Sequence, residues 1–296
     1  MNYFFQSSLV YSNKSDYLSC STISKYFFPI FILLGISSCA YNDPKPKAQL
    51  RLVRTHNSAL REIKVQTNQK SQITIYYESP EWKRVGHAID RVIQAADARV
   101  REFITPQPGL NLEIVLLNRH KFSENVTDAT WVTAAYHKGR IFIPIDPKSL
   151  PKAKDLGNTL AHEYAHAVLD NLTKGKVPAW LDEGFALTVE NQPLPSSKAR
   201  FHDWIKTHKL FPISKLQSGF THFHRDDATL AYVQSLYMVG FLLKNYDTAQ
   251  LQQFCINLAE GFEEEEAFNK AYQLTTETFL ANLNQQLKNI ITNKKL

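Results

Sequence analysis

The stretch that decides the fold is TLAHEYAHAVLDNLTKGKVPAWLDEGFALTVE, at residues 159–190. It contains HEYAH, in which His162 and His166 flank Glu163. Apolar residues recur around this pentapeptide at helical spacing, so it is predicted to lie on a helix with one packed face. Two histidines four residues apart project from the same side of a helix, close enough to share a metal ion. A structural pair of buried histidines is the alternative when the pentapeptide is taken alone.

The second half of this stretch supplies a candidate for a third metal ligand. A catalytic zinc ion takes three protein ligands and leaves a fourth position for water. Pro178 is expected to begin a second helix after a turn that contains Gly175, and this helix carries Glu183, with 16 residues between it and His166. A short loop and a reversed helix would bring Glu183 back against the histidines. Gly184 costs a helix about 1 kcal/mol relative to alanine, which indicates a close approach between two helices.

The combination of HExxH, a gap of 16 residues and WLDEG resembles the gluzincin metallopeptidases. Within them it is similar to the peptidase-MA-like domains of bacterial exported lipoproteins. The resemblance continues in LAYVQSLYMVGFLLKNY at residues 230–246 and includes strands expected at 111–117 and 130–145. It therefore covers most of residues 72–290, although only the two metal-site motifs are highly specific.

This resemblance implies a role for each residue of the motifs. His162, His166 and Glu183 would bind Zn2+, which lowers the pKa of a bound water toward neutrality. Glu163 would be the general base that takes a proton as this water attacks a carbonyl and then passes it to the leaving amine. Tyr232 is the candidate for a second donor to the oxyanion, although a core tyrosine is an equally good interpretation because its neighbours share an apolar helical face.

Several other polar residues are candidates for supporting roles. Asp170, four residues after His166, either orients a ligand or is an ordinary acidic residue near a helix end. Gluzincins often carry an aspartate four residues after the ligand glutamate, but Leu187 occupies that position here. His222 and His224 are either further oxyanion donors or solvated loop residues.

Substrate binding is inferred from the resemblance alone. Zincins generally bind an extended peptide along an edge strand beside the active-site helix, through backbone hydrogen bonds. RIFIPID, at residues 140–146, is the expected edge strand. Because such binding recognises the backbone more than side chains, the sequence predicts little about specificity.

The pattern of the whole chain predicts an α+β fold of zincin type. Residues 61–78 alternate apolar and polar positions around a polar turn and predict a hairpin. A helix is expected to begin after Ser79, followed by a buried strand at 111–117. Two further strands are joined by a tight turn at 138–140. From Asp155 onward almost every segment is predicted to be helical, so strands and one helix would pack on an active-site helix, followed by a mainly helical C-terminal half.

The N-terminus predicts export. Residues 26–36 form an apolar run that is too short to span a bilayer but suits a signal peptide. The ISSC that ends this region at 36–39 resembles the lipobox of bacterial lipoproteins, in which the cysteine is lipidated and becomes the first mature residue. We therefore expect a signal peptide at 1–38, a tether at 39–60 and one metallopeptidase domain at 61–296, rich in strands to about residue 150. An ordinary secretory signal is the alternative.

Charge and cysteine usage agree with this interpretation. Cys39 would carry the lipid, and Ala40 after it favours the outer membrane, facing the periplasm. The net charge of +6 lies before residue 72, which suits a segment near an anionic membrane and is a poor footprint for nucleic-acid binding. Only Cys255 would stay free after processing, and its apolar context predicts a buried residue.

Together these patterns predict a membrane-anchored zinc metallopeptidase that hydrolyses peptide bonds. Two alternatives stay open: a non-catalytic envelope protein that keeps the fold for binding or scaffolding, and a zinc amidase that acts on cell-wall peptide. The expected partners are a peptide or protein substrate and the membrane, through Cys39, with no nucleic acid. The sequence does not determine the oligomeric state.

Overall fold

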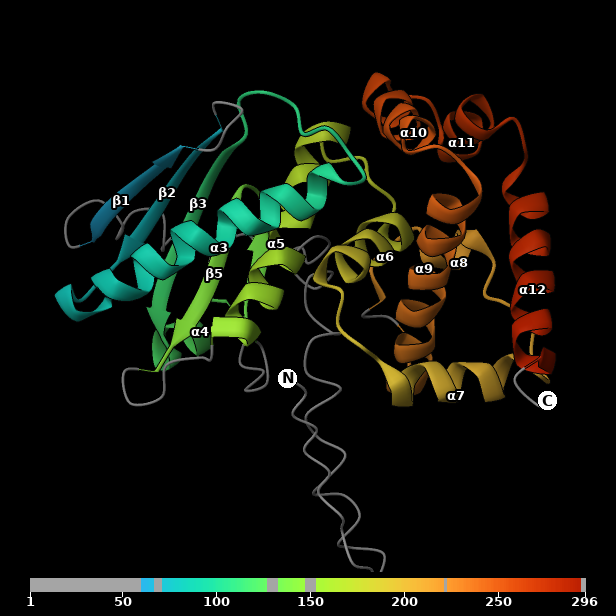
Figure 1. The fold of residues 1–296 in the computed structure, drawn as a ribbon, viewed down its shortest axis with the longest axis horizontal. Helices are drawn as coiled ribbons and strands as arrows, with labels where there is room; N and C mark the ends of the chain where they lie inside the picture. The colour runs from blue at the N-terminus through green and yellow to red at the C-terminus, as the bar shows by residue number, and fades with distance from the viewer. Residues whose placement is uncertain (1–59, 67–70, 127–132, 147–152, 221–222, 294–296) are drawn as a thin grey trace, which may run out of the picture.

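The computed structural model describes residues 60–293, with the exception of 67–70, 127–132, 147–152 and 221–222. The predicted signal peptide and tether, including Cys39, lie outside the described residues. Within the described part of the chain, a five-stranded sheet is followed by a series of helices (Figure 1). No helix among these residues is long and apolar enough to cross a membrane.

The sheet is mixed, with its strands in the order β1-β2-β3-β5-β4. The strands are β1 (Arg61–Gln66), β2 (Gln72–Tyr77), β3 (Asn111–Asn118), β4 (Ala135–His137) and β5 (Arg140–Ile145). The three central strands are parallel, and β1 and β4 are antiparallel to their neighbours at the two edges. The antiparallel pairing of β1 with β2 confirms the predicted hairpin.

The edge strand beside the metal-site helix is β4, so the prediction that RIFIPID forms this edge was wrong. β5 pairs with β3 on one side and with β4 on the other. Lys138 and Gly139 both have positive φ, 44° and 79°, as a two-residue hairpin turn requires. This turn was predicted, and because it folds the chain back on itself, Ala135–His137 becomes the outer strand.

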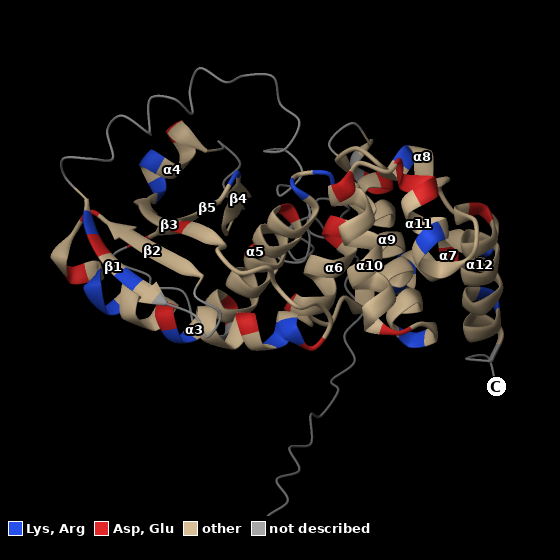
Figure 2. Ribbon diagram, turned by 90° about the horizontal axis from the view of Figure 1, so that it is seen from above, with Lys and Arg blue, Asp and Glu red and all other residues tan. Residues whose placement is uncertain are grey.

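Both faces of the sheet are covered, because side chains alternate across it. Leu112, Ile114 and Leu116 of β3 belong to the main core, whereas Val115 and Leu117 pack in a smaller cluster with Phe122 of α4. The covering helices are α3 (Lys83–Arg101), which follows a short 3-10 turn at Pro80–Trp82, α4 (Arg119–Asn125) and α5 (Ala153–Thr173). Figure 2 shows α4 and α3 on opposite sides of the sheet.

The C-terminal half is helical and shares one core with the sheet. Its helices are α6 (Ala179–Glu190), α7 (Pro195–Ile205), α8 (Ile213–Leu216), α9 (Arg225–Asn245), α10 (Thr248–Glu260), α11 (Glu264–Tyr272) and α12 (Thr276–Asn293). Buried apolar contacts run continuously from Val65 in β1 to Leu287 in α12. Cys255 is a free and fully buried residue of α10, as predicted. The predicted α+β fold with a helical second half is confirmed.

Trp180 anchors α6 in this core. It is fully buried, and its ring stacks on Phe254 of α10 and packs at an angle against Phe279 of α12. Its indole N–H donates to the carboxylate of Glu264 at 2.8 Å. The tryptophan of the WLDEG motif therefore fixes the start of α6 and lets the next residues face α5.

At Gly184, α6 meets the backbone of α9 directly. A Cβ atom at this position would lie 2.3 Å from the carbonyl oxygen of Ser235 and 2.7 Å from a side-chain carbon of Val239. Backbone atoms cannot rotate out of the way as a flexible side chain can, so only glycine fits without separating the helices. The predicted close approach of two helices is confirmed, and α9 is the partner.

We expect Gly184→Ala to destabilise the protein by about 1–3 kcal/mol or more, because the added methyl group overpacks a rigid contact. Urea denaturation would measure the change in the free energy of unfolding. Gly240→Ala is the matched control, since nothing lies within 4 Å of a Cβ at this other helical glycine of α9. That control should be neutral or stabilising by up to about 1 kcal/mol. Equal stability of the two variants would contradict the close contact.

Candidate metal centre

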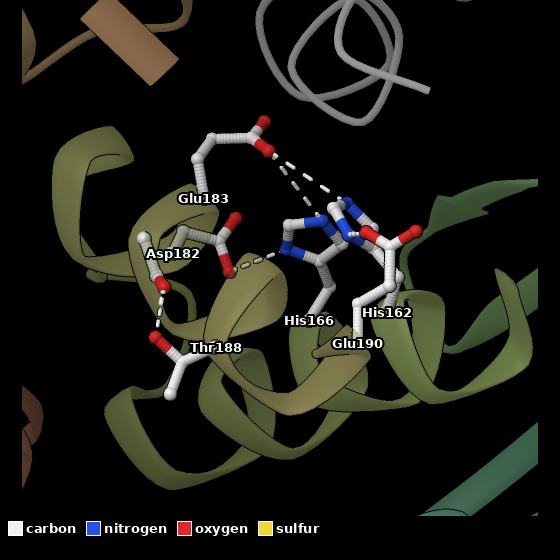
Figure 3. Close-up of polar contacts among 7 residues, drawn as sticks. His162, His166, Asp182, Glu183, Thr188 and Glu190 are labelled. Carbon is white, nitrogen blue, oxygen red and sulfur yellow. Dashed lines mark hydrogen bonds and ion pairs between the residues drawn. The ribbon is translucent and has the colours of Figure 1, made fainter. Parts of the chain in front are cut away.

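α5 and α6 bring His162, His166 and Glu183 together in the interior (Figure 3). All three residues are buried, with 1% of each exposed. The Nε2 atom of each histidine lies 3.8 Å from Oε2 of Glu183, and the two imidazole centroids are 4.8 Å apart. The prediction that a reversed helix returns Glu183 to the histidine pair is therefore confirmed.

The reversal depends on the turn after α5. Lys174 and Gly175 adopt left-handed backbone conformations, with φ of 53° and 77°. The N–H of Gly175 donates to the carbonyl of Asp170 at 2.9 Å, which closes the end of the helix. Pro178 then precedes the first residue of α6. Glycine was expected in this turn, and its positive φ explains why it suits the position.

Two carboxylates orient the histidines by contacting their Nδ1 atoms. Nδ1 of His162 lies 3.0 Å from Oε2 of Glu190, and Nδ1 of His166 lies 2.7 Å from Oδ1 of Asp182. Because an ionised carboxylate only accepts hydrogen bonds, each Nδ1 is placed to donate its proton, and each Nε2 is the ring nitrogen on the side of Glu183. These contacts, drawn in Figure 3, fix the orientation of the two rings, as binding of one metal ion through both Nε2 atoms requires.

Sequence reasoning missed both orienting roles. Glu190 follows Glu183 by seven residues, or two helical turns, so the two side chains share a face of α6. Asp182 is adjacent to Glu183 in the motif. Leu187, where gluzincins often have an aspartate, is buried in the hydrophobic core instead. The spacing of seven residues between Glu183 and Glu190 was the signal in the sequence that could have indicated the orienting role of Glu190.

Asp170 does not orient a ligand directly, because Glu190 and Asp182 occupy the Nδ1 positions of both histidines. Its carboxylate accepts a hydrogen bond from the phenol of Tyr136, at 2.5 Å. The interpretation that Asp170 orients a metal ligand was therefore wrong. The partner of Asp170 lies 34 residues earlier in the chain, in a strand that was expected from the sequence pattern but whose contact with α5 was not.

The centre carries more negative than positive charge in a buried environment. Burial lowers the pKa of His166, but the carboxylates of Asp182 and Glu183 outweigh it and raise this pKa to about 10. Burial raises the pKa of Glu183 to about 7, against the lowering effect of the histidines. Burial likewise raises the pKa of Glu163. Protons are thus drawn to a cluster that a divalent cation would neutralise instead.

The residues present fit a zinc ion. Nε2 of His166 and Oε1 of Glu183 are buried and make no hydrogen bond to the residues that the structure describes, which is costly unless another group binds them. Two ligands at about 2.1 Å from one ion lie at most about 4.2 Å apart, and the 3.8 Å between each Nε2 and Oε2 satisfies this limit. Two imidazoles and one carboxylate form a donor set typical of catalytic zinc.

Glu163 lies on the same helix between the two histidines. It is 4% exposed, and its carboxylate accepts a hydrogen bond from the backbone N–H of Tyr136 in β4. Its Oε2 atom makes no hydrogen bond to any residue in the described part of the chain. One carboxylate oxygen is thus left to act on a water or a substrate.

The remaining predicted site residues lie at the start of α9 and before it. Tyr232 is buried in α9, where its ring packs edge-to-face against Phe220 at 4.9 Å between centroids. His224 is exposed and occupies the N-cap position of α9, where its side chain makes no capping hydrogen bond. His222 lies outside the described residues. Tyr232 lies one turn before Ser235, which contacts Gly184 in α6.

Among solved structures, the chain is similar to M1 zinc metallopeptidases. It shows 16% identity and a TM-score of 0.44 to a point mutant of the enzyme from Deinococcus radiodurans, covering 76% of this chain and 52% of that one. It shows 13% identity and a TM-score of 0.44 to leukotriene A4 hydrolase from Saccharomyces cerevisiae, covering 75% of this chain and 37% of that one. The chain thus spans about half or less of the proteins it resembles.

The family comparison is more direct. No curated protein sequence matches the chain significantly. A sequence model of the Peptidase MA superfamily, however, matches residues 123–293, more than half of the chain and the part that contains both metal-site motifs. The chain belongs to the Peptidase MA superfamily.

Proposed function

We propose that this chain is a membrane-anchored zinc metallopeptidase that hydrolyses peptide bonds, with one catalytic domain at residues 61–296. The observation that carries the proposal is the buried convergence of His162, His166 and Glu183, in which Nε2 of His166 and Oε1 of Glu183 have no hydrogen-bond partner among the described residues. Glu163 lies beside them with one free carboxylate oxygen. Membership of the superfamily supports the same chemistry.

The metal ion would be bound by His162, His166 and Glu183. Zinc in such a site supplies a Lewis acid that activates a water and polarises a carbonyl. Burial raises the pKa of Glu163, which brings this carboxyl closer to the neutral range in which a general base works best. Glu163 would accept a proton from the attacking water and deliver it to the leaving amine.

Two further elements fit this chemistry. Tyr232 is our proposed second donor to the oxyanion, because α9 lies against the segment of α6 that carries Glu183. β4, the edge strand of the sheet among the described residues, is the proposed binding edge for an extended peptide. The N–H of Tyr136 donates to Glu163, so we propose that the strand binds such a substrate through its remaining backbone groups.

We expect Glu163→Gln to retain zinc but to lower the rate of peptide hydrolysis by about 10²- to 10⁴-fold. Glutamine keeps the size of the side chain and cannot accept the proton. Metal content would be measured by elemental analysis, and hydrolysis with labelled casein. Full casein cleavage by the variant would rule out the proposed base.

His162→Ala is the control for this experiment, because it removes a ligand and should lose both zinc and activity. Wild type that binds zinc and cleaves peptidoglycan peptides but not casein would favour the cell-wall amidase. Wild type that is purified without chelator and contains no zinc would favour the non-catalytic alternative.

We expect Glu190→Gln to weaken zinc binding by about 10- to 100-fold, because the carboxylate orients His162 and increases its basicity. Competition with a chelating dye would measure the dissociation constant. Glu260→Gln, at the exposed end of α10, removes the same charge away from the centre and should leave the constant unchanged. Equal constants for the two variants would contradict the orienting role of Glu190.

We further propose that Cys39 is lipidated and holds the protein at the outer membrane, facing the periplasm. The apolar run and the ISSC sequence before the cysteine support this placement. Cys39→Ser should move the protein from the membrane fraction to the soluble fraction of cells that express the full chain. Mass spectrometry should find the mature N-terminus of the wild type at Cys39, and a different N-terminus would contradict lipidation.

A further inference from the structure

We propose that Tyr136 is a positioning residue for the general base, an inference that rests on the function proposed above. Its phenol fixes the edge strand β4 on α5, and β4 in turn directs a backbone N–H at Glu163. The proposal concerns a side chain that none of the sequence motifs includes.

Tyr136 contacts the metal-site helix at three places. Its backbone N–H donates to the carboxylate of Glu163. Its ring stacks against the imidazole of His166, with centroids 6.5 Å apart and planes at 20°. Its hydroxyl donates to Oδ2 of Asp170, at 2.5 Å. One residue of β4 is therefore bonded to or packed against α5 at successive turns of the helix.

The phenol also accepts a hydrogen bond from the turn of its own hairpin. The N–H of Gly139, in the turn between β4 and β5, donates to the Tyr136 hydroxyl at 3.0 Å. The hydroxyl thus joins the turn of the hairpin to the side chain of Asp170. Burial and Asp170 raise the pKa of this phenol far above its ordinary value, so it remains the proton donor of the pair.

β4 needs such a connection because the sheet constrains it weakly. The strand has three residues, and among the residues that the structure describes it pairs only with β5. Alternate N–H groups of an edge strand point away from the sheet, and that of Tyr136 is directed at Glu163. If β4 shifts along α5, this N–H shifts with it, and the carboxylate of Glu163 loses the contact that orients it.

Tyr164 provides a matched comparison on the same helix. Its hydroxyl also donates to a buried aspartate, Asp97, at 2.8 Å, but Asp97 belongs to α3 and is also paired with Arg101. The hydroxyl of Tyr164 therefore ties α5 to α3, whereas that of Tyr136 ties α5 to the β4–β5 hairpin. A purely structural role for buried Tyr–Asp pairs predicts similar effects at both tyrosines, whereas our proposal predicts a difference.

The test compares Tyr136→Phe with Tyr164→Phe, both loaded with zinc. Each variant loses one hydroxyl and should show a similar decrease in Tm. Tyr136→Phe should lower kcat on labelled casein by about 10- to 100-fold, the effect of a small misplacement of a reacting group, with a smaller change in KM. Tyr164→Phe should keep the kcat of the wild type. The zinc dissociation constant should be unchanged in both, because phenylalanine preserves the ring against His166.

Hydrogen exchange gives a readout that does not depend on activity. Backbone amides of residues 135–137 should exchange faster in Tyr136→Phe than in wild type or Tyr164→Phe. Asp170→Asn keeps an oxygen acceptor and should behave like wild type, whereas Asp170→Ala should behave like Tyr136→Phe. Combining Asp170→Ala with Tyr136→Phe should add no further loss, as expected for two partners of one interaction.

Two results would overturn the inference: unchanged exchange at 135–137 in Tyr136→Phe, or equal losses of kcat in the two tyrosine variants. A wild type that binds zinc but cleaves no casein would count against the proposed function instead. In that case the exchange experiment still decides whether the phenol fixes β4, since it requires no substrate.

Discussion

Four carboxylates and two imidazoles occupy one buried region between α5 and α6, and the surrounding structure is arranged around this charge. Glu163, Glu183 and Glu190 are each no more than 4% exposed, and no lysine or arginine pairs with any of them in the described part of the chain. Burying so many acids is unfavourable unless they bind a cation or protons. The raised pKa of His166 and Glu183 expresses this cost, and a divalent ion bound by three of the residues would remove it.

The rest of the fold supplies rigid contacts that hold this cluster together. Gly184 lets the backbone of α9 approach α6, while Trp180 fixes the start of α6 against α10 and α12. On the other side, the β4–β5 hairpin is joined to α5 through Tyr136. The candidate ligand Glu183 and the proposed base Glu163 are thus each supported by an element that is distant in sequence. Such support from packed neighbours is what keeps a site in its productive geometry.

Much of the secondary structure and the ligand set was predictable from residue patterns. The alternation in 61–78, the turn at Lys138 and Gly139 and the helical spacing of HEYAH all gave the observed elements. Failures occurred where partners come from different elements. Asp170 was considered as a partner of a histidine four residues away, but it bonds to a tyrosine in the sheet. The strand RIFIPID was placed at the edge, but the hairpin puts β4 outside it.

The sequence by itself determined that His162, Glu163 and His166 lie on one helix and that Glu183 follows on a second, because helical periodicity and turn residues act over a few positions. It also determined that a glycine was needed where two helices meet. Only the tertiary structure decided that α9 fills that contact, that Glu190 and Asp182 orient the imidazoles, and that Tyr136 reaches α5 from the edge strand. These relations depend on how elements pack across long stretches of chain, and residue spacing within one element does not determine which partner each side chain meets.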